Sequence, residues 1–185
     1  GFFFFFSTYA LLLNRSAVAF FSFPTLRYLT HSGAAMAPEM ARRLKSVFPG
    51  TRIFIMYGQT EAGARLSYLD PNEIERKPGS IGKGIPGVTL TLRDKAGQPV
   101  PLGQVGEIVA RGENIMAGYW QRPEETKEVL RPEGLWTGDL ARSDDEGFLS
   151  IVSRKSDLIK SGSHRIGPKE IEDVLSEHAA VHEVA

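Results

Sequence analysis

The sequence has no cysteine among its 185 residues, which excludes disulfides, thiolate zinc sites and a cysteine nucleophile. It has only four histidines, and the pair His178 and His182 lacks the third nearby ligand that a zinc site needs. Lysine plus arginine and aspartate plus glutamate number 22 each, so no net charge attracts nucleic acid or an anionic membrane surface.

Long apolar runs are scarce too, and the run at residues 1–13, GFFFFFSTYALLL, is too short to span a bilayer. It is similar to the apolar part of a signal peptide, but no basic residue precedes it and no clear cleavage site follows it. We therefore expect a buried helix or strand here, no transmembrane segment and a cytoplasmic location.

A strand, a helix and a second strand follow in the pattern of a βαβ unit. The apolar runs at residues 26–33 and 52–57 are typical of buried strands. Between them a helix begins at Pro38, which suits a first turn, and ends before Pro49, with apolar residues such as Leu44 on one face. Two strands joined in this way are expected to be parallel.

The pattern changes after this unit. Residues 70–87 are rich in proline and glycine and predict a loop. Short strands separated by turns then predict a distorted antiparallel barrel over residues 88–153, interrupted by one short helix. Beyond Arg154 a helical pattern predicts the start of a small α+β domain. The predicted fold class is α/β, with residues 1–153 in a truncated large domain and residues 154–185 in a hinge and the small domain.

Polar residues follow the second strand directly, in the segment YGQTE. Ligands in α/β sheets lie beyond the carboxyl ends of parallel strands, so this segment and HSGAA, after the first strand, are candidate ligand loops. Tyr57 can stack on a flat ring, and Gly58 allows a ligand to approach the backbone. Thr60 can donate to a phosphate oxygen, and Glu61 can bind Mg²⁺. An equally good alternative is that Thr60 caps a helix and Glu61 occupies its first turn.

Three other segments have weaker signals. Residues 79–87, GSIGKGIPG, match G-x-G-x-x-G, but Pro86 lies inside the pattern and a strand follows, so a turn is the better interpretation. Asp139, at the mouth of a predicted strand, can accept from the vicinal hydroxyls of a ribose, although a turn carboxylate is the simpler interpretation. The segment from Arg154 to Arg165, which includes Lys160, is dense in positive charge and is either a ligand-binding segment or a solvated linker.

Taken together and in order, these segments resemble the AMP-forming acyl-CoA synthetases, a superfamily that includes luciferases and peptide-synthetase adenylation domains. The resemblance covers residues 26–185, and the matching segments are SGAAMAP, MYGQTEAG, GSIGKGIPGV, GEIVARGENIMAGYW, PEETKEVL, LWTGDLARSDDEGFLSIVSRKSDLIKSG and RIGPKEIEDVL. It implies an enzyme that joins a fatty or aryl carboxylic acid to ATP, giving acyl-AMP and pyrophosphate. The acyl group then passes to coenzyme A.

The resemblance also implies roles for residues. Those that it places at the nucleotide are Gly33, Ala34, Ala35, Tyr57, Gly58, Thr60, Glu61, Asp139, Arg154 and Lys160. Tyr57 would stack on adenine, beside the backbone of residues 33–35. Thr60, at the α-phosphate, and Glu61, at the Mg²⁺, would be the catalytic residues. Asp139 would hold the ribose hydroxyls.

The junction after Arg154 corresponds to the hinge of the family, and Arg154 itself would contact ribose or phosphate. Ser156 stands where the family usually has Asp or Lys. Ser163 stands where it usually has Gly beside the pantetheine tunnel, and the extra Cβ and hydroxyl argue against efficient thioester formation.

Two elements of the family, its phosphate loop and its adenylation lysine, are not found in the 185 residues. We therefore expect the chain to be a fragment that is inactive as a free polypeptide. Two alternatives stay open: an adenylating enzyme that loads a carrier-protein phosphopantetheine, and a non-catalytic nucleotide-binding remnant.

Overall fold

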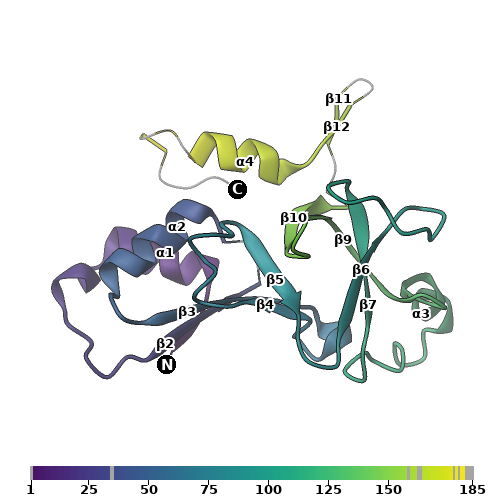
Figure 1. The fold of residues 1–185 in the computed structure, drawn as a ribbon, viewed down its shortest axis with the longest axis horizontal. Coiled ribbons are helices and arrows are strands. Elements are labelled where there is room, and N and C mark those ends of the chain that lie inside the picture. Colours follow the sequence, from purple (N-terminus) through teal and green to yellow (C-terminus); the bar gives the residue numbers. More distant parts are fainter. Residues whose placement is uncertain are drawn as a thin grey trace. The chain divides into compact units, whose positions relative to one another are not determined.

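The structure is a computed structural model that describes residues 2–33, 36–157, 159–161, 164–176, 178 and 180–181. It comprises two compact units, Gly1–Ile85 and Pro86–Ala185 (Figure 1). Among the described residues, no helix is both long enough and apolar enough to cross a membrane.

The first unit is a mixed sheet with helices on one face (Figure 1). Its strands, in spatial order, are β1 (Phe2–Phe5), β2 (Tyr28–Ser32), β3 (Arg52–Tyr57), β4 (Ser67–Leu69) and β5 (Ser80–Gly84). Its helices are α1 (Phe6–Arg15) and α2 (Pro38–Val47), with 3₁₀ turns η1 (Val18–Phe20) and η2 (Thr60–Ala62). Strands β1, β2 and β3 run parallel, whereas β4 is antiparallel to both β3 and β5.

The predicted βαβ unit is confirmed by β2, α2 and β3. The two strands pair in parallel, with His31 beside Ile55. Helix α2 begins at Pro38 and buries Leu44 in the core. The N-terminal apolar run forms β1 and α1, and Tyr9 of α1 is fully buried. Local apolar periodicity therefore predicts this part of the fold well.

The loop predicted for residues 70–87 is in part wrong, because this segment contains β5. Ile81 is buried in it, and the hydroxyl of Ser67 donates to the Ile81 carbonyl oxygen at 2.8 Å. Gly82 has φ +78°, and a Cβ added there would lie 1.8 Å from the carbonyl oxygen of Tyr68. The glycine that suggests a loop is therefore required by close packing of β5 on β4.

The second unit is an antiparallel sheet followed by a hairpin and a helix. Its strands are β6 (Thr89–Arg93), β7 (Gly106–Arg111), β8 (Leu130–Arg131), β9 (Gly134–Ser143), β10 (Leu149–Arg154), β11 (Ile159–Ser161) and β12 (His164–Ile166). Its helices are α3 (Pro123–Val129) and α4 (Pro168–Ser176). The core side chains include Ile108, Val109, Leu135, Trp136, Ala141 and Leu149.

Within this unit the strands follow the order β10-β9-β7-β6, and β8 pairs with β9. The predicted α/β class and the antiparallel strands of its second half are confirmed. In the described part of the unit no pairing joins β6 to β10, so the sheet is open where a barrel was expected. The compact units divide after Ile85, and the domain boundary predicted after Ser153 stays a prediction.

Candidate nucleotide-binding site

The carboxyl ends of β2 and β3 lie at the same edge of the first sheet. Because His31 pairs with Ile55 in the parallel register, Gly33 and Tyr57 both follow two residues later. Gly33 is exposed and has φ +95°, and Tyr57 is half-buried at the end of β3. The sheet thus brings the two candidate loops together, although Ala34 and Ala35 lie outside the described residues.

The segment after Tyr57 is a tight loop that returns into β4. The N–H groups of Ala62 and Ala64 both donate to the carbonyl oxygen of Gln59 at 3.0 Å. A Cβ added to Gly58 would lie only 2.5 Å from the carbonyl oxygen of Ala64. Gly58 is therefore needed for the loop to pack on itself. From the sequence alone, this glycine was expected to allow a ligand to approach the backbone.

Thr60 and Glu61 lie in the 3₁₀ turn η2. The N-cap of this turn is Gln59, without a side-chain cap hydrogen bond. The alternative that Thr60 caps a helix is therefore wrong, whereas Glu61 does occupy the first turn. Thr60 is exposed and Glu61 is half-buried. A hydroxyl and a carboxylate on adjacent residues suit a phosphate and the oxygen-liganded Mg²⁺ that accompanies it.

In the second unit, Asp139 lies within β9, so its expected place at the mouth of a strand is wrong. The strand begins earlier, at Gly134, because Leu135 and Trp136 are buried in the core. The register between β7 and β9 shifts at this point, and residues 137–139 oppose Ile108 alone. Bulges of this kind redirect side chains and are frequent beside active sites.

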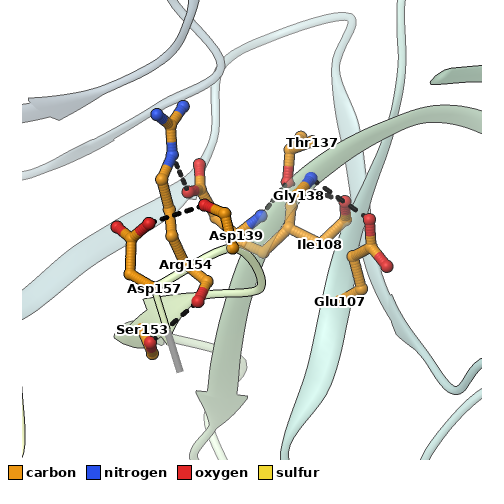
Figure 2. A network of polar contacts seen from close by, with 9 residues as sticks. Glu107, Ile108, Thr137, Gly138, Asp139, Ser153, Arg154 and Asp157 are labelled. Carbon is orange, nitrogen blue, oxygen red and sulfur yellow. Dashed lines mark hydrogen bonds and ion pairs between the residues drawn. The ribbon is translucent and has the colours of Figure 1, made fainter. Parts of the chain in front are cut away.

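Asp139 is held by both its backbone and its side chain (Figure 2). Its Oδ1 accepts from Nε of Arg154 at 3.1 Å, and it is 8% exposed. Its N–H donates to Oγ1 of Thr137 at 3.2 Å, and that hydroxyl donates to the carbonyl oxygen of Ile108 at 2.9 Å. The Arg154 side chain is 59% exposed. An acceptor carboxylate and donor guanidinium side by side suit the hydroxyls and phosphates of a nucleotide.

Sequence reasoning overlooked Glu107 and did not single out Lys155, although the structure joins them. The carboxylate of Glu107 is buried in β7 and accepts from Gly138 N–H at 3.1 Å (Figure 2). It also accepts from Nζ of Lys155 at 2.9 Å. The available signal was the carboxylate in the run GEIVAR, whose first five residues are all buried.

The remaining candidates lie near the predicted hinge. Lys160 belongs to β11, and only its backbone is described. Ser156 is exposed, and its hydroxyl donates to Oδ1 of Asp157 at 2.6 Å. Ser163 and His182 lie outside the described residues.

The candidate residues are divided between the two compact units. Tyr57, Thr60 and Glu61 belong to the first, and Asp139 and Arg154 belong to the second. That these residues meet around one nucleotide stays a prediction.

Comparison with known proteins identifies the family. A family model described as AMP-binding enzyme matches residues 3–120. The chain belongs to the AMP-binding enzyme family. Among curated relatives of this family, a long-chain-fatty-acid–CoA ligase from Yersinia pestis is 38% identical over 174 residues. The match covers 94% of this chain and 31% of that ligase, so the chain spans less than a third of its relative's length.

Solved structures agree with this AMP-binding family assignment. The amide bond synthetase McbA from Marinactinospora thermotolerans has a TM-score of 0.90 and 29% identity, covering 99% of this chain and 37% of that one. The O-succinylbenzoate coenzyme A synthetase from Bacillus subtilis, in complex with ATP and magnesium ion, has a TM-score of 0.85 and 30% identity. That match covers 98% of this chain and 37% of the synthetase. The predicted resemblance to adenylate-forming enzymes is confirmed.

Proposed function

We propose that this chain is the nucleotide-binding part of an ATP-dependent acid–CoA ligase. Such an enzyme joins a carboxylic acid to ATP, giving acyl-AMP and pyrophosphate, and passes the acyl group to the thiol of coenzyme A. The observation that carries the proposal is the buried Asp139 carboxylate paired with exposed Arg154. This pair lies in a chain that belongs to the AMP-binding family, and 94% of the chain aligns with a fatty-acid–CoA ligase.

In this proposal the first unit recognises adenine and the α-phosphate. Tyr57 offers an aromatic face to adenine, and the backbone of residues 33–35 lies beside the same ring. The hydroxyl of Thr60 donates a hydrogen bond to an α-phosphate oxygen, and Glu61 supplies a carboxylate ligand for Mg²⁺. When bound, Mg²⁺ neutralises negative charge on the phosphates.

The second unit recognises the ribose. Asp139 accepts from the vicinal hydroxyls, and its direction is set by the hydrogen bonds through Thr137 to Ile108. Arg154 and Lys160 add positive charge for ribose or phosphate oxygens. Catalysis by these residues consists of positioning and charge stabilisation, without a covalent enzyme intermediate.

The acid and the acceptor are open to direct test. Fatty and aryl acids are both proposed substrates, because the relatives above include a long-chain-fatty-acid ligase and an O-succinylbenzoate synthetase. Coenzyme A is the proposed acceptor. The alternatives are the phosphopantetheine of a carrier protein and, from the similarity to an amide bond synthetase, an amine. A cytoplasmic location remains part of the proposal.

The deciding experiment is acid-dependent exchange of labelled pyrophosphate into ATP by the full gene product with Mg²⁺. Long-chain fatty acids and O-succinylbenzoate are supplied in turn, followed by each acceptor. We expect exchange with one acid class and product formation with coenzyme A, both strongly reduced by Asp139→Asn. Nucleotide binding without exchange for any acid would support a non-catalytic remnant, and absence of nucleotide binding would overturn the proposal.

A further inference from the structure

Glu107 is a buried carboxylate to which the proposed reaction gives no role. It is 7% exposed and lies in β7, in a strand that is otherwise glycine, apolar residues and a terminal arginine. Burial of a charged carboxylate is costly unless its oxygens are paired. Here both oxygens are paired, with partners 31 and 48 positions away in the sequence.

One partner is the bulge that carries Asp139. Oε1 of Glu107 accepts from the N–H of Gly138 at 3.1 Å (Figure 2). The next residue of β7, Ile108, accepts from the hydroxyl of Thr137 at 2.9 Å. Two successive residues of β7 therefore fix the two residues that immediately precede Asp139.

The other partner is Lys155, directly after β10. Its Nζ donates to Oε2 of Glu107 at 2.9 Å, and its backbone N–H donates to the carbonyl oxygen of Gly138 at 2.8 Å. The preceding residue, Arg154, contacts the carboxylate of Asp139. The bulge, the end of β10 and Glu107 thus form a closed ring of contacts within the second unit.

We propose that Glu107 is a positioning residue for ribose recognition. Its carboxylate holds the bulge at Gly138 and, through Lys155, the end of β10, so that Asp139 and Arg154 present their side chains together. The inference rests on the proposed function, because it requires a nucleotide at Asp139. Loss of the Glu107 carboxylate is expected to misplace Asp139 without removing any group that touches the nucleotide.

A merely structural carboxylate would change stability and leave selectivity for the ribose unaltered. The selectivity is measured with ATP and 2′,3′-dideoxy-ATP, which lacks both hydroxyls that Asp139 is proposed to bind. The ratio of the two dissociation constants reports how well Asp139 is placed. A general loss of stability would lower the affinity for both nucleotides by the same factor and leave the ratio unchanged.

The experiment measures both dissociation constants for the full gene product and its variants, with Mg²⁺ present. Glu107→Gln keeps an oxygen acceptor for Gly138 but loses the charge that pairs with Lys155, whereas Glu107→Ala loses both. We expect the preference for ATP to fall about three- to tenfold in Glu107→Gln and about ten- to a hundredfold in Glu107→Ala.

A variant of Lys155 provides a second, independent test of the positioning role. Lys155→Met leaves the buried carboxylate of Glu107 without its cation, so its effect should exceed that of Glu107→Gln. In the double variant Glu107→Gln/Lys155→Met the buried charge is gone, and part of the preference for ATP over 2′,3′-dideoxy-ATP should return. The control is Lys127→Met, which breaks an exposed ion pair of 2.8 Å with Glu124 on α3 and should leave the ratio unchanged.

The outcomes separate this inference from the proposed function. An unchanged ratio in both Glu107 variants, with a lost preference in Asp139→Asn, overturns the positioning role alone. No preference for ATP in the unmodified protein, or no effect of Asp139→Asn, overturns the proposed ribose site itself. Thermal unfolding accompanies each measurement, and if Glu107→Ala does not fold, the isosteric Glu107→Gln decides.

Discussion

The hydroxyl of Tyr9 donates to the carbonyl oxygen of Thr30 at 2.9 Å and so ties α1 to β2. Tyr9 has no exposed surface, and its ring centroid lies 6.1 Å from that of His31. Burial raises the pKa of Tyr9 to about 12 from its ordinary value of 10.0. The contact lies three residues before Gly33, so it supports the strand that ends at the first candidate loop.

The first prediction concerns stability at high pH. Tyr9 titrates near pH 10 in the unfolded chain and near pH 12 in the folded one, so its contribution is complete below pH 10 and is lost as the pH rises to about 12. The free energy of unfolding should fall over this range by about 3 kcal/mol from this residue. Urea unfolding at pH 9 to 12 should show a smaller decrease for Tyr9→Phe. Tyr28→Phe, at an exposed ring, is the control and should retain the full decrease.

The second prediction concerns the loop that carries Thr60 and Glu61. Gly58→Ala introduces a Cβ against the backbone of Ala64, so it should lower the free energy of unfolding by about 3 kcal/mol or more. Gly50→Ala meets no atom within 4 Å but requires φ +78°, and should cost about 1–2 kcal/mol. Urea titrations compare the two variants, and equal losses would mean that the loop yields to the added atom.

Local signals in the sequence predict the elements whose residues determine their own conformation. Pro38 starts α2 as expected. Turn residues of the kind expected between short strands occur at Asp94–Gly97, which follows β6, and at Asp144–Gly147, which joins β9 to β10. Each turn is closed by a glycine N–H that donates to the aspartate carbonyl oxygen. Parallel pairing of β2 and β3 follows from the same local pattern and places both candidate loops at one edge.

Features that depend on distant partners were not predictable in this way. The bulge at residues 137–139 exists because β9 pairs with β7 on both sides of it, and that register has no local signal. The ion pair between Glu107 and Lys155 joins residues 48 positions apart. Strand β5 was not predicted because a glycine in a sequence suggests a turn. In the structure, Gly82 is instead required by the close approach of the neighbouring strand.

The third prediction concerns Arg154. Arg154→Met should weaken ATP binding by the full gene product about tenfold or more, because the variant loses a cation beside the Asp139 carboxylate. The matched control is Arg142→Met, at an exposed position of the same sheet. Calorimetric titration with ATP measures both. Equal affinities in the two variants would remove Arg154 from the nucleotide site.

The last prediction concerns Glu61, which is half-buried in the first turn of η2 beside exposed Thr60. Glu61→Gln keeps the shape of the side chain but removes the charge that a hard cation prefers. In the full gene product, the rate of pyrophosphate exchange should therefore need a higher Mg²⁺ concentration to reach half its maximum, by about tenfold. Glu39→Gln, at an exposed position of α2, should leave the Mg²⁺ dependence unchanged.

The shape of this titration distinguishes a metal ligand from a residue that supports the loop. If Glu61 binds Mg²⁺, excess Mg²⁺ restores much of the rate in Glu61→Gln, because mass action compensates for the weaker site. If Glu61 acts only through the favourable electrostatics of a first-turn carboxylate, the rate falls by the same factor at every Mg²⁺ concentration. A parallel displacement of the whole curve to lower rates, without a shift along the Mg²⁺ axis, would therefore exclude Glu61 as a metal ligand and leave it as a structural residue of η2.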